Sequence, residues 1–305
     1  MKTRSSAAYP MLVAAVAIWG ASYPVTRYAL RFIPPFTLAF LRYGLSALLF
    51  ALCMGGRLRI PKSETGTVLL LGLAGGAGFV MFMNLGMSFT TGLSGSLLSG
   101  APPLITALLA LAILKEPLHR GTVAGLAAGL AGVLCVTGSS LVSGGAFSSA
   151  FAGDALILMS QFCWALYTVI GKRAAGRMEG AVAGAWTIIV AAGLLFPFAL
   201  AESVWGRPCV VTGGAIWAVL YLTVLNTALA YLLWNRALHL VGASTAAGFQ
   251  FIQPLSGALV AMALLGEALT YLLAAGAALI LAGVSLMAHA GRRGPASPPS
   301  RPSHQ

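Results

Sequence analysis

Long apolar stretches separated by short polar breaks run through almost the whole of this 305-residue chain. A helix that crosses a membrane needs about 20 predominantly apolar residues. Ten stretches are of that order, at residues 10–30, 35–54, 66–88, 93–114, 121–140, 154–174, 181–201, 214–236, 243–265 and 270–290. The pattern predicts an all-α integral membrane protein with ten transmembrane helices, and no connection between them is long enough to fold as a soluble domain.

The composition indicates the same class of protein. Hydrophobic residues make up 59% of the chain and charged residues only 8%, whereas soluble domains carry about 25% charged residues. Such a chain cannot cover itself with a water-compatible surface. The cysteines have no CxxC or metal-site spacing, so we expect no metal and no cofactor and interpret them as small apolar residues: Cys53, Cys135, Cys163 and Cys209.

The net charge of +12 would indicate a nucleic-acid partner in a soluble chain, but in a membrane protein Lys and Arg mark the cytoplasmic side. With a cytoplasmic N-terminus, that side receives Lys2, Arg4, Arg57, Arg59, Lys62, Lys115, Arg120, Lys172, Arg173, Arg177, Arg236, Arg292, Arg293 and Arg301. The outer side receives only Arg27, Arg31 and Arg207, and Arg42 lies within a span. The distribution predicts that both termini are cytoplasmic, and we expect no nucleic-acid partner.

The two halves of the chain resemble each other. At an offset of 151 residues the superposed pairs are Asn84 and Asn235, Pro103 and Pro254, Glu116 and Glu267, Gly125 and Gly276, and Gly132 and Gly283. We expect two five-helix repeats, at residues 10–140 and 154–290. Because five is odd, the second repeat enters the membrane from the opposite side. The other segments are a cytoplasmic N-terminal segment (1–9), an outer loop (141–153) and a disordered basic cytoplasmic tail (291–305).

Prolines interrupt the fourth and ninth predicted helices at matching positions, at Pro102 and Pro103 and again at Pro254. In a bilayer, a proline-broken helix is tolerated where it is buried in protein or lines a cavity. Paired interruptions are the best sequence indication of a transporter's binding region. The alternative interpretation is a packing kink that makes no contact with substrate.

Four short motifs carry a family resemblance: WGASYPVTR (19–27), LAFLRYGLSALL (38–49), LKEPL (114–118) and LLGEAL (264–269). In this order, within two five-helix units, they resemble the EamA-type branch of the drug/metabolite transporter superfamily. The resemblance covers residues 10–290 and implies a permease of the cell (inner) membrane, commonly an exporter of amino acids or other small metabolites. It also implies a central cavity surrounded by helices one to four and six to nine. The scarcity of carboxylates within the spans departs from typical members.

Polar and aromatic residues at depth in a predicted helix usually face the interior of the bundle. The candidate cavity residues are Trp19, Tyr23, Arg42, Asn84, Ser99, Gln161, Trp164, Tyr167, Tyr231, Asn235, Gln250 and Gln253. Amides and aromatic rings suit a neutral or zwitterionic solute. The alternative for each is an interhelical hydrogen bond or an interfacial position, and Arg42 is expected to bind either a substrate carboxylate or carbonyls freed by a broken helix. We interpret Glu116 and Glu267 as capping or turn residues at helix ends.

The sequence thus predicts a secondary carrier that moves a small organic metabolite outward, by rocking of two inverted halves around a midplane cavity. A passive channel of the same fold is the first alternative, because no carboxylate lies at midspan. An intramembrane serine hydrolase is the second, because GLSG at 92–95 matches a GxSG pattern, but His239 and His289 are predicted far from Ser94. The expected partners are a small-molecule substrate and the lipid bilayer, and the expected assembly is a monomer or homodimer.

Overall fold

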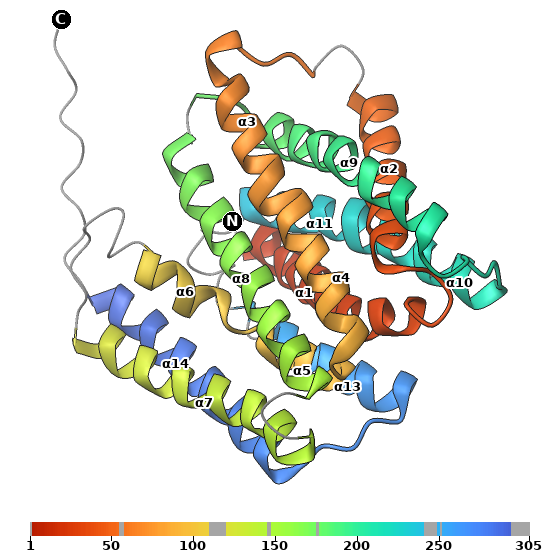
Figure 1. Ribbon diagram of the computed structural model, residues 1–305. Helices are drawn as coiled ribbons and strands as arrows, with labels where there is room; N and C mark the ends of the chain where they lie inside the picture. The colour runs from red at the N-terminus through yellow and green to blue at the C-terminus, as the bar shows by residue number, and fades with distance from the viewer. Residues whose placement is uncertain are drawn as a thin grey trace, which may run out of the picture.

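Every regular element that the computed structural model describes is a helix (Figure 1). The structure describes residues 2–54, 58–109, 120–144, 148–174, 177–240, 249–250 and 252–293. The first half contains α1 Lys2–Ala29, α2 Pro35–Met54, η2 Lys62–Glu64, α3 Thr65–Leu71, η3 Gly72–Gly78, α4 Phe79–Phe89, α5 Gly92–Leu98, α6 Pro102–Leu109 and α7 Arg120–Gly144. The second half contains α8 Ser149–Ala174, α9 Gly180–Trp205, α10 Gly213–Leu220, η5 Tyr221–Leu229, α11 Ala230–Leu240, α13 Ile252–Leu265 and α14 Tyr271–Arg293.

Within the described ranges, eight helices are long and apolar enough to cross a membrane. Two shorter apolar helices, Ile252–Leu265 and Tyr271–Met287, coincide with the ninth and tenth apolar stretches. The described chain therefore has eight to ten helices of membrane-spanning character, as expected for a multi-pass membrane protein. Residues 241–248 of the ninth predicted helix, and residues 294–305 of the expected disordered tail, lie outside the described residues.

Several helix ends differ from the predicted ones. The predicted loop at 141–153 is mostly helical, because α7 continues to Gly144 and α8 begins at Ser149. At the N-terminus α1 begins at Lys2, so most of the 1–9 segment continues the first helix. A helix can continue past the end of its apolar stretch, because polar residues also fit its hydrogen-bond ladder. Hydropathy alone therefore does not locate helix ends.

The fourth predicted helix is divided into two. α5 ends at Leu98 and α6 begins with Pro102 and Pro103, leaving residues 99–101 as a turn. Proline fits the first turn of a helix, because its missing N–H would have no intrahelical partner there. Pro254 occupies the corresponding place in the first turn of α13. Pro102, Pro103 and Pro254 therefore stand at helix starts.

Contacts between the two halves of the chain hold the bundle together. α1 packs against α11 and α13 of the second half, and α8 packs against α4 and α6 of the first half. α2 lies along α9, α5 along α13, and α7 along α14, and the last pair forms one edge of the bundle (Figure 1). An ion pair between Glu64 Oε1 and Arg177 Nε, 3.5 Å apart, joins the connection before α3 to the connection before α9.

Glycines allow α7 and α14 to approach closely. A Cβ atom added to Gly132 would lie 2.7 Å from the carbonyl oxygen of Gly276, and one added to Gly125 would lie 2.5 Å from that of Gly283. Because 125 faces 283 while 132 faces 276, the two helices are antiparallel. Inside lipid there is little hydrophobic drive between helices, and close backbone packing supplies the attraction instead.

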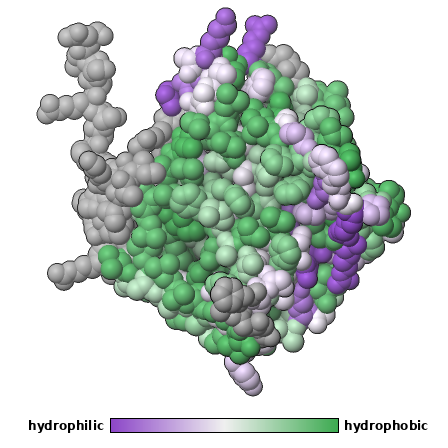
Figure 2. Space-filling view, in the orientation of Figure 1, coloured by the Kyte–Doolittle hydropathy of each residue, from purple (hydrophilic) through white to green (hydrophobic). Residues whose placement is uncertain are grey.

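An apolar surface surrounds the bundle. In Figure 2, hydrophobic residues cover the middle of the visible face, while hydrophilic residues gather near the start of α3 and along the edge beside α10. Large apolar side chains such as Leu52, Leu134 and Leu259 are 73%, 70% and 63% exposed. Soluble proteins rarely expose extended apolar patches, so this surface indicates contact with lipid.

Candidate functional site

Polar side chains from α1, α2, α8 and η5 lie inside the bundle, and we call them the central polar cluster. Its members are Trp19, Tyr23, Arg42, Tyr43, Gln161, Tyr221, Thr223, Asn226 and Thr227. Six of them are buried, and Trp19, Tyr221 and Thr227 are half-buried. The amide nitrogen of Gln161 donates hydrogen bonds to the Tyr23 hydroxyl at 3.1 Å and to Ser160 Oγ at 2.9 Å. The first of these bonds joins α1 of the first half to α8 of the second.

The η5 segment is a π-helix, in which backbone hydrogen bonds span five residues instead of four. Such segments displace carbonyl groups from the regular ladder and are frequent at functional sites. In η5 the carbonyl oxygen of Asn226 accepts a hydrogen bond from the Trp19 indole N–H at 3.1 Å. The Tyr221 hydroxyl donates to the Ile18 carbonyl at 2.9 Å. The η5 backbone is thereby attached to the middle of α1.

Arg42 places a positive charge within this cluster, and its side chain is only 7% exposed. Its Nε donates to Thr227 Oγ1 at 3.4 Å, and its guanidinium lies 5.5 Å from the centre of the Tyr43 ring. The Arg42 guanidinium therefore lies against the Tyr43 ring of its own helix and a hydroxyl group of η5.

Four buried polar atoms in this region have no hydrogen-bond partner among the described residues: Arg42 Nη1, Asn226 Oδ1, Thr223 Oγ1 and Thr26 Oγ1. Thr223 lies one turn before Asn226 on η5, and Thr26 lies one turn after Tyr23 on α1. Leaving a buried donor or acceptor unpaired costs about 1–3 kcal/mol, and more for a charged group. Arg42 Nη1 is a cationic donor that lacks an acceptor, and Asn226 Oδ1 is an amide acceptor that lacks a donor.

Two predicted cavity residues form hydrogen bonds to backbone instead. The Asn84 amide donates to the Pro35 carbonyl at 2.9 Å and ties α4 to the start of α2. The Ser99 hydroxyl donates to the Ser96 carbonyl at 2.6 Å, in the turn between α5 and α6. Both side chains are buried. The Asn84 bond is of the interhelical kind named as an alternative above, whereas the Ser99 bond is local to its own turn.

Trp164 and Tyr167 of α8 form a row of aromatic rings with Phe79 of α4. The Trp164 ring lies 5.2 Å from that of Tyr167 and 5.3 Å from that of Phe79. A Cβ atom added to Gly75 of η3 would collide with the Tyr167 ring, so the ring packs directly on this backbone. Trp164 is 40% exposed. The structure places this pair against η3, the π-helical segment of the first half.

The predicted residues of the last helices are only partly described. Gln250 is exposed and its carbonyl accepts a hydrogen bond from the N–H of Gln253 at 3.1 Å. Gln253 is half-buried. Tyr231 and Asn235 lie on α11, but their side chains are outside what the structure describes. Glu116 lies entirely outside the described residues.

Two carboxylates make contacts that were not predicted from the sequence. Asp154 was not identified there, and Glu267 was interpreted only as a capping or turn residue at a helix end. Asp154 is fully buried at the start of α8 and accepts hydrogen bonds from the hydroxyls of Thr90 and Ser140, the latter at 2.6 Å. A carboxylate that enters an apolar stretch needs hydrogen-bond partners. The position of Asp154 beside the small residue Gly153 therefore indicated such a contact in the sequence. Glu267, in the connection between α13 and α14, caps α5, since it accepts from the N–H of Gly92 at 2.8 Å.

A largely apolar helical bundle with a buried polar cluster at its centre defines a membrane transport protein. The EamA-like transporter family model matches residues 6–138 and 151–288. The chain therefore belongs to the EamA-like transporter family, which confirms the resemblance seen in its motifs. Because this family and the relatives below are transporters, the serine hydrolase alternative is excluded, and buried Ser94 is part of the α5 packing.

Several curated relatives cover nearly the whole chain. An uncharacterized transporter of Bacillus subtilis, YyaM, is 27% identical over 90% of this chain and 92% of its own. An uncharacterized transporter of Archaeoglobus fulgidus is 27% identical over 92% of this chain and 97% of its own. A probable amino-acid metabolite efflux pump of Salmonella typhimurium is 28% identical over 88% of this chain and 90% of its own. A solved crystal structure, 22% identical with a TM-score of 0.65, covers 94% of this chain and 98% of that one and shares its fold.

Proposed function

We propose that this chain is a secondary carrier that exports a small organic metabolite, such as an amino acid or a related compound, across the inner membrane of the cell. Two inverted five-helix repeats rock around the central polar cluster, so that the cluster opens alternately to the two faces. Substrate that binds from the cytoplasm is then released outside.

The pattern of helix contacts supports the two-repeat arrangement. When the two halves are matched, α1 corresponds to α8, α6 to α13 and α4 to α11. The contacts of α1 with α13 and α11 then have their counterparts in the contacts of α8 with α6 and α4. The contacts of α2 with α9 and of α7 with α14 are unchanged by the exchange. Two halves related in this way can exchange conformations at similar free energy, which is a physical basis for alternating access.

The ion pair between Glu64 and Arg177 supports the inverted topology. It brings the connection after the second apolar stretch next to the connection after the sixth. In an inverted repeat both connections face the cytoplasm. In a parallel repeat the membrane would separate them, and this contact could not form.

The observation that carries the substrate proposal is the pair of unpaired buried groups Arg42 Nη1 and Asn226 Oδ1. A guanidinium N–H suits a carboxylate, and an amide oxygen suits an ammonium group. The aromatic rings of Tyr23, Tyr43 and Tyr221 add apolar contact and cation–π attraction for an ammonium. The efflux pump relative from Salmonella supports the same chemical class.

Metabolite profiling followed by reconstitution tests this proposal. Cells that overproduce the protein are expected to accumulate its substrate in the medium, and the best candidate is then offered to proteoliposomes. A carrier shows counterflow, in which unlabelled substrate inside accelerates the entry of labelled substrate. Equal uptake with and without internal substrate would indicate a channel of the same fold, and no uptake of any exported compound would overturn the transport proposal.

A further inference from the structure

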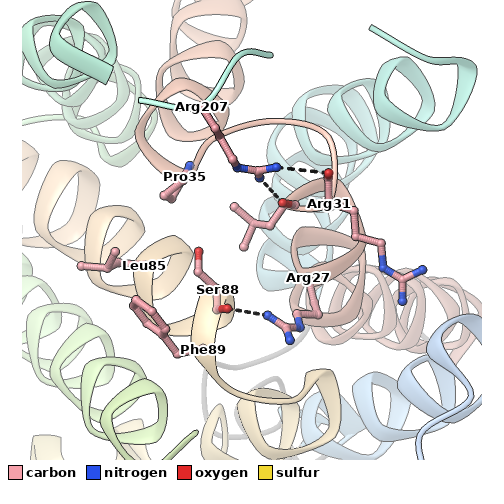
Figure 3. Close-up of a pocket in the computed structure, with 8 residues that line it drawn as sticks. Arg27, Arg31, Pro35, Leu85, Ser88, Phe89 and Arg207 are labelled. Atoms are coloured by element: carbon pink, nitrogen blue, oxygen red, sulfur yellow. Dashed lines mark hydrogen bonds between the residues drawn. The ribbon is translucent and has the colours of Figure 1, made fainter. Parts of the chain in front are cut away.

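A second cationic site lies at the end of α1, away from the central polar cluster. A cavity of about 420 Å³ is lined by Arg27, Leu30, Arg31, Pro35, Leu85, Ser88, Phe89 and Arg207 (Figure 3). Three of these eight residues are arginines and none is a carboxylate. They are also the three basic residues that the charge distribution assigned to the outer side.

Two of the three arginines of this cavity, Arg27 and Arg207, are held by backbone carbonyls. Arg27 Nη1 donates to the carbonyls of Met87 and Ser88, both at 2.7 Å, at the C-terminal end of α4. Arg207 donates to the carbonyls of Leu30, Arg31 and Ile33 at the end of α1. These bonds position the guanidinium groups without neutralising their charge.

The carboxylates close to this region are engaged with other groups. Both Glu267 oxygens accept from backbone N–H groups of α5, which fixes the position of this carboxylate without cancelling its charge. Glu202 accepts from the N–H of Thr37 at 2.6 Å and from its hydroxyl at 2.8 Å. The Arg31 guanidinium lies 5.6 Å from the centre of the Tyr28 ring, and no described carboxylate forms an ion pair with Arg27, Arg31 or Arg207.

The opposite wall of the cavity is apolar. Figure 3 shows Arg27 directed toward Ser88, with Leu85 and Phe89 beside Ser88, Arg207 across the opening and the Arg31 guanidinium directed away from Ser88. Phe89, Arg31 and Arg207 are exposed, so a ligand can enter from the surface. Cations facing an apolar wall suit a molecule with one anionic group and a short apolar part. Arg27 is four residues after Tyr23, about 6 Å along the helix axis, and no residue of the central polar cluster lines this cavity.

We propose that the cavity bounded by Arg27, Arg31 and Arg207 is an anion-binding site at the outer end of the bundle, which binds an amphiphile through its carboxylate or phosphate group. The guanidinium N–H groups of Arg27 and Arg207 that are not bonded to carbonyls hold the anion by charge-assisted hydrogen bonds, while Arg31 contributes positive charge from the rim of the cavity. Leu85 and Phe89 contact the apolar part. The anion comes either from a soluble organic acid or from the head group of an anionic phospholipid.

Binding to the detergent-purified protein tests this site in two arms. In the first arm, native mass spectrometry measures retention of dioleoylphosphatidylglycerol, with dioleoylphosphatidylcholine as the zwitterionic comparison. In the second arm, thermal unfolding is followed with hexanoate, and hexyltrimethylammonium serves as a cation of equal chain length. The variants are R31Q, R207Q and L85W, and the last fills the cavity without changing charge. R59Q, at an exposed arginine away from the cavity, is the matched control for charge.

Each arm identifies one source of the anion. Preferential retention of phosphatidylglycerol that weakens at least tenfold in R31Q and L85W, but not in R59Q, supports a lipid ligand. A stabilising shift by hexanoate that is lost in the same variants supports a soluble acid. R207Q also removes three hydrogen bonds to backbone carbonyls, so its binding is interpreted only if it elutes as a folded monomer or dimer. If it does not, R31Q and L85W decide the result. Equal binding by wild type, R31Q and L85W in both arms would overturn the proposal, and because the readout is binding, that result leaves the transport proposal untouched.

Discussion

The carboxylate of Glu267 accepts a hydrogen bond from the backbone N–H of Leu93 at 2.6 Å, although the two residues are 174 positions apart in the chain. Its second oxygen accepts from Gly92, and Thr91 Oγ1 accepts from Ser94 at 3.0 Å. The first N–H groups of α5, which have no intrahelical partner, are thereby satisfied partly from the other half of the chain. Gly266, with a φ of 69°, ends α13 in the left-handed conformation that directs the chain toward α5.

Glu267→Gln is expected to lower the free energy of unfolding by about 1–2 kcal/mol, because the amide keeps one acceptor and loses the charge that favours a helix N-terminus. Chemical unfolding in detergent measures the change. Glu179→Gln is the control, since that side chain forms no capping bond to α9. Equal stability of the two variants would show that the Glu267 contact contributes nothing measurable.

Gly20→Ala is expected to destabilise the protein by about 1–3 kcal/mol, because an added methyl group overlaps the Gln253 carbonyl and the Ser256 hydroxyl and forces α1 away from α13. Gly193→Ala in α9 is the matched control, because an added Cβ atom there meets nothing within 4 Å. That control should be neutral or slightly stabilising. The difference between their thermal midpoints in detergent measures the contact, and matching losses would contradict it.

Arg42→Lys is expected to reduce transport in proteoliposomes about tenfold or more while the protein stays folded. Lysine keeps the charge but lacks the second guanidinium nitrogen that is available to a carboxylate. Arg59→Lys is the control for the same chemical change at an exposed position. Transport by Arg42→Lys at the wild-type rate would remove Arg42 from the substrate site.

Thr223→Val separates a functional hydroxyl from a structural one. The Thr223 hydroxyl is buried without a partner among the described residues, so its removal should leave stability unchanged or slightly higher, while transport falls. The Thr187 hydroxyl donates to the Ala183 carbonyl at 2.8 Å, so Thr187→Val should cost about 1 kcal/mol. Unfolding and transport are measured on both variants. A loss of stability in Thr223→Val without a loss of transport would assign that hydroxyl to the fold.

Single-cysteine labelling tests the inverted topology. In a background without the native cysteines, cysteines at Arg59 and Glu179 are expected to react from the same, cytoplasmic side. Both positions are exposed and lie on the connections that the Glu64–Arg177 pair joins. A membrane-impermeant maleimide applied to intact and to permeabilised cells gives the readout. Labelling of the two positions from opposite sides would rule out the inverted arrangement.

Much of the architecture was predictable because lipid imposes a simple rule. The apolar stretches predicted the membrane-spanning helices, since only a helix can satisfy its backbone inside a bilayer and a stretch of that length is needed to cross it. The same rule failed at helix ends such as Gly144 and Ser149. It also gave no signal for η3 and η5, because a π-helical segment differs from an α-helix by hydrogen-bond pattern and not by composition.

The candidate site was predictable only as a set of side chains. Polarity at depth selected Tyr23, Arg42 and Gln161, which the fold places inside the bundle. It selected Asn84 equally, although the structure uses that amide to bind the Pro35 carbonyl. Hydropathy cannot distinguish a buried side chain that forms hydrogen bonds to backbone from one whose polar atoms stay unpaired, because both are polar residues within an apolar stretch.

By itself, the sequence determined the class of protein, the family, the number of apolar stretches and the places where proline divides them. These features follow from local composition and from spacing along the chain. Only the tertiary structure decided that Glu267 caps α5, that Asp154 is held by Thr90 and Ser140, and that Arg42 keeps an unpaired nitrogen beside η5. Each of these depends on which distant groups meet at hydrogen-bond distance, and helix packing fixes that relation after the helices have formed.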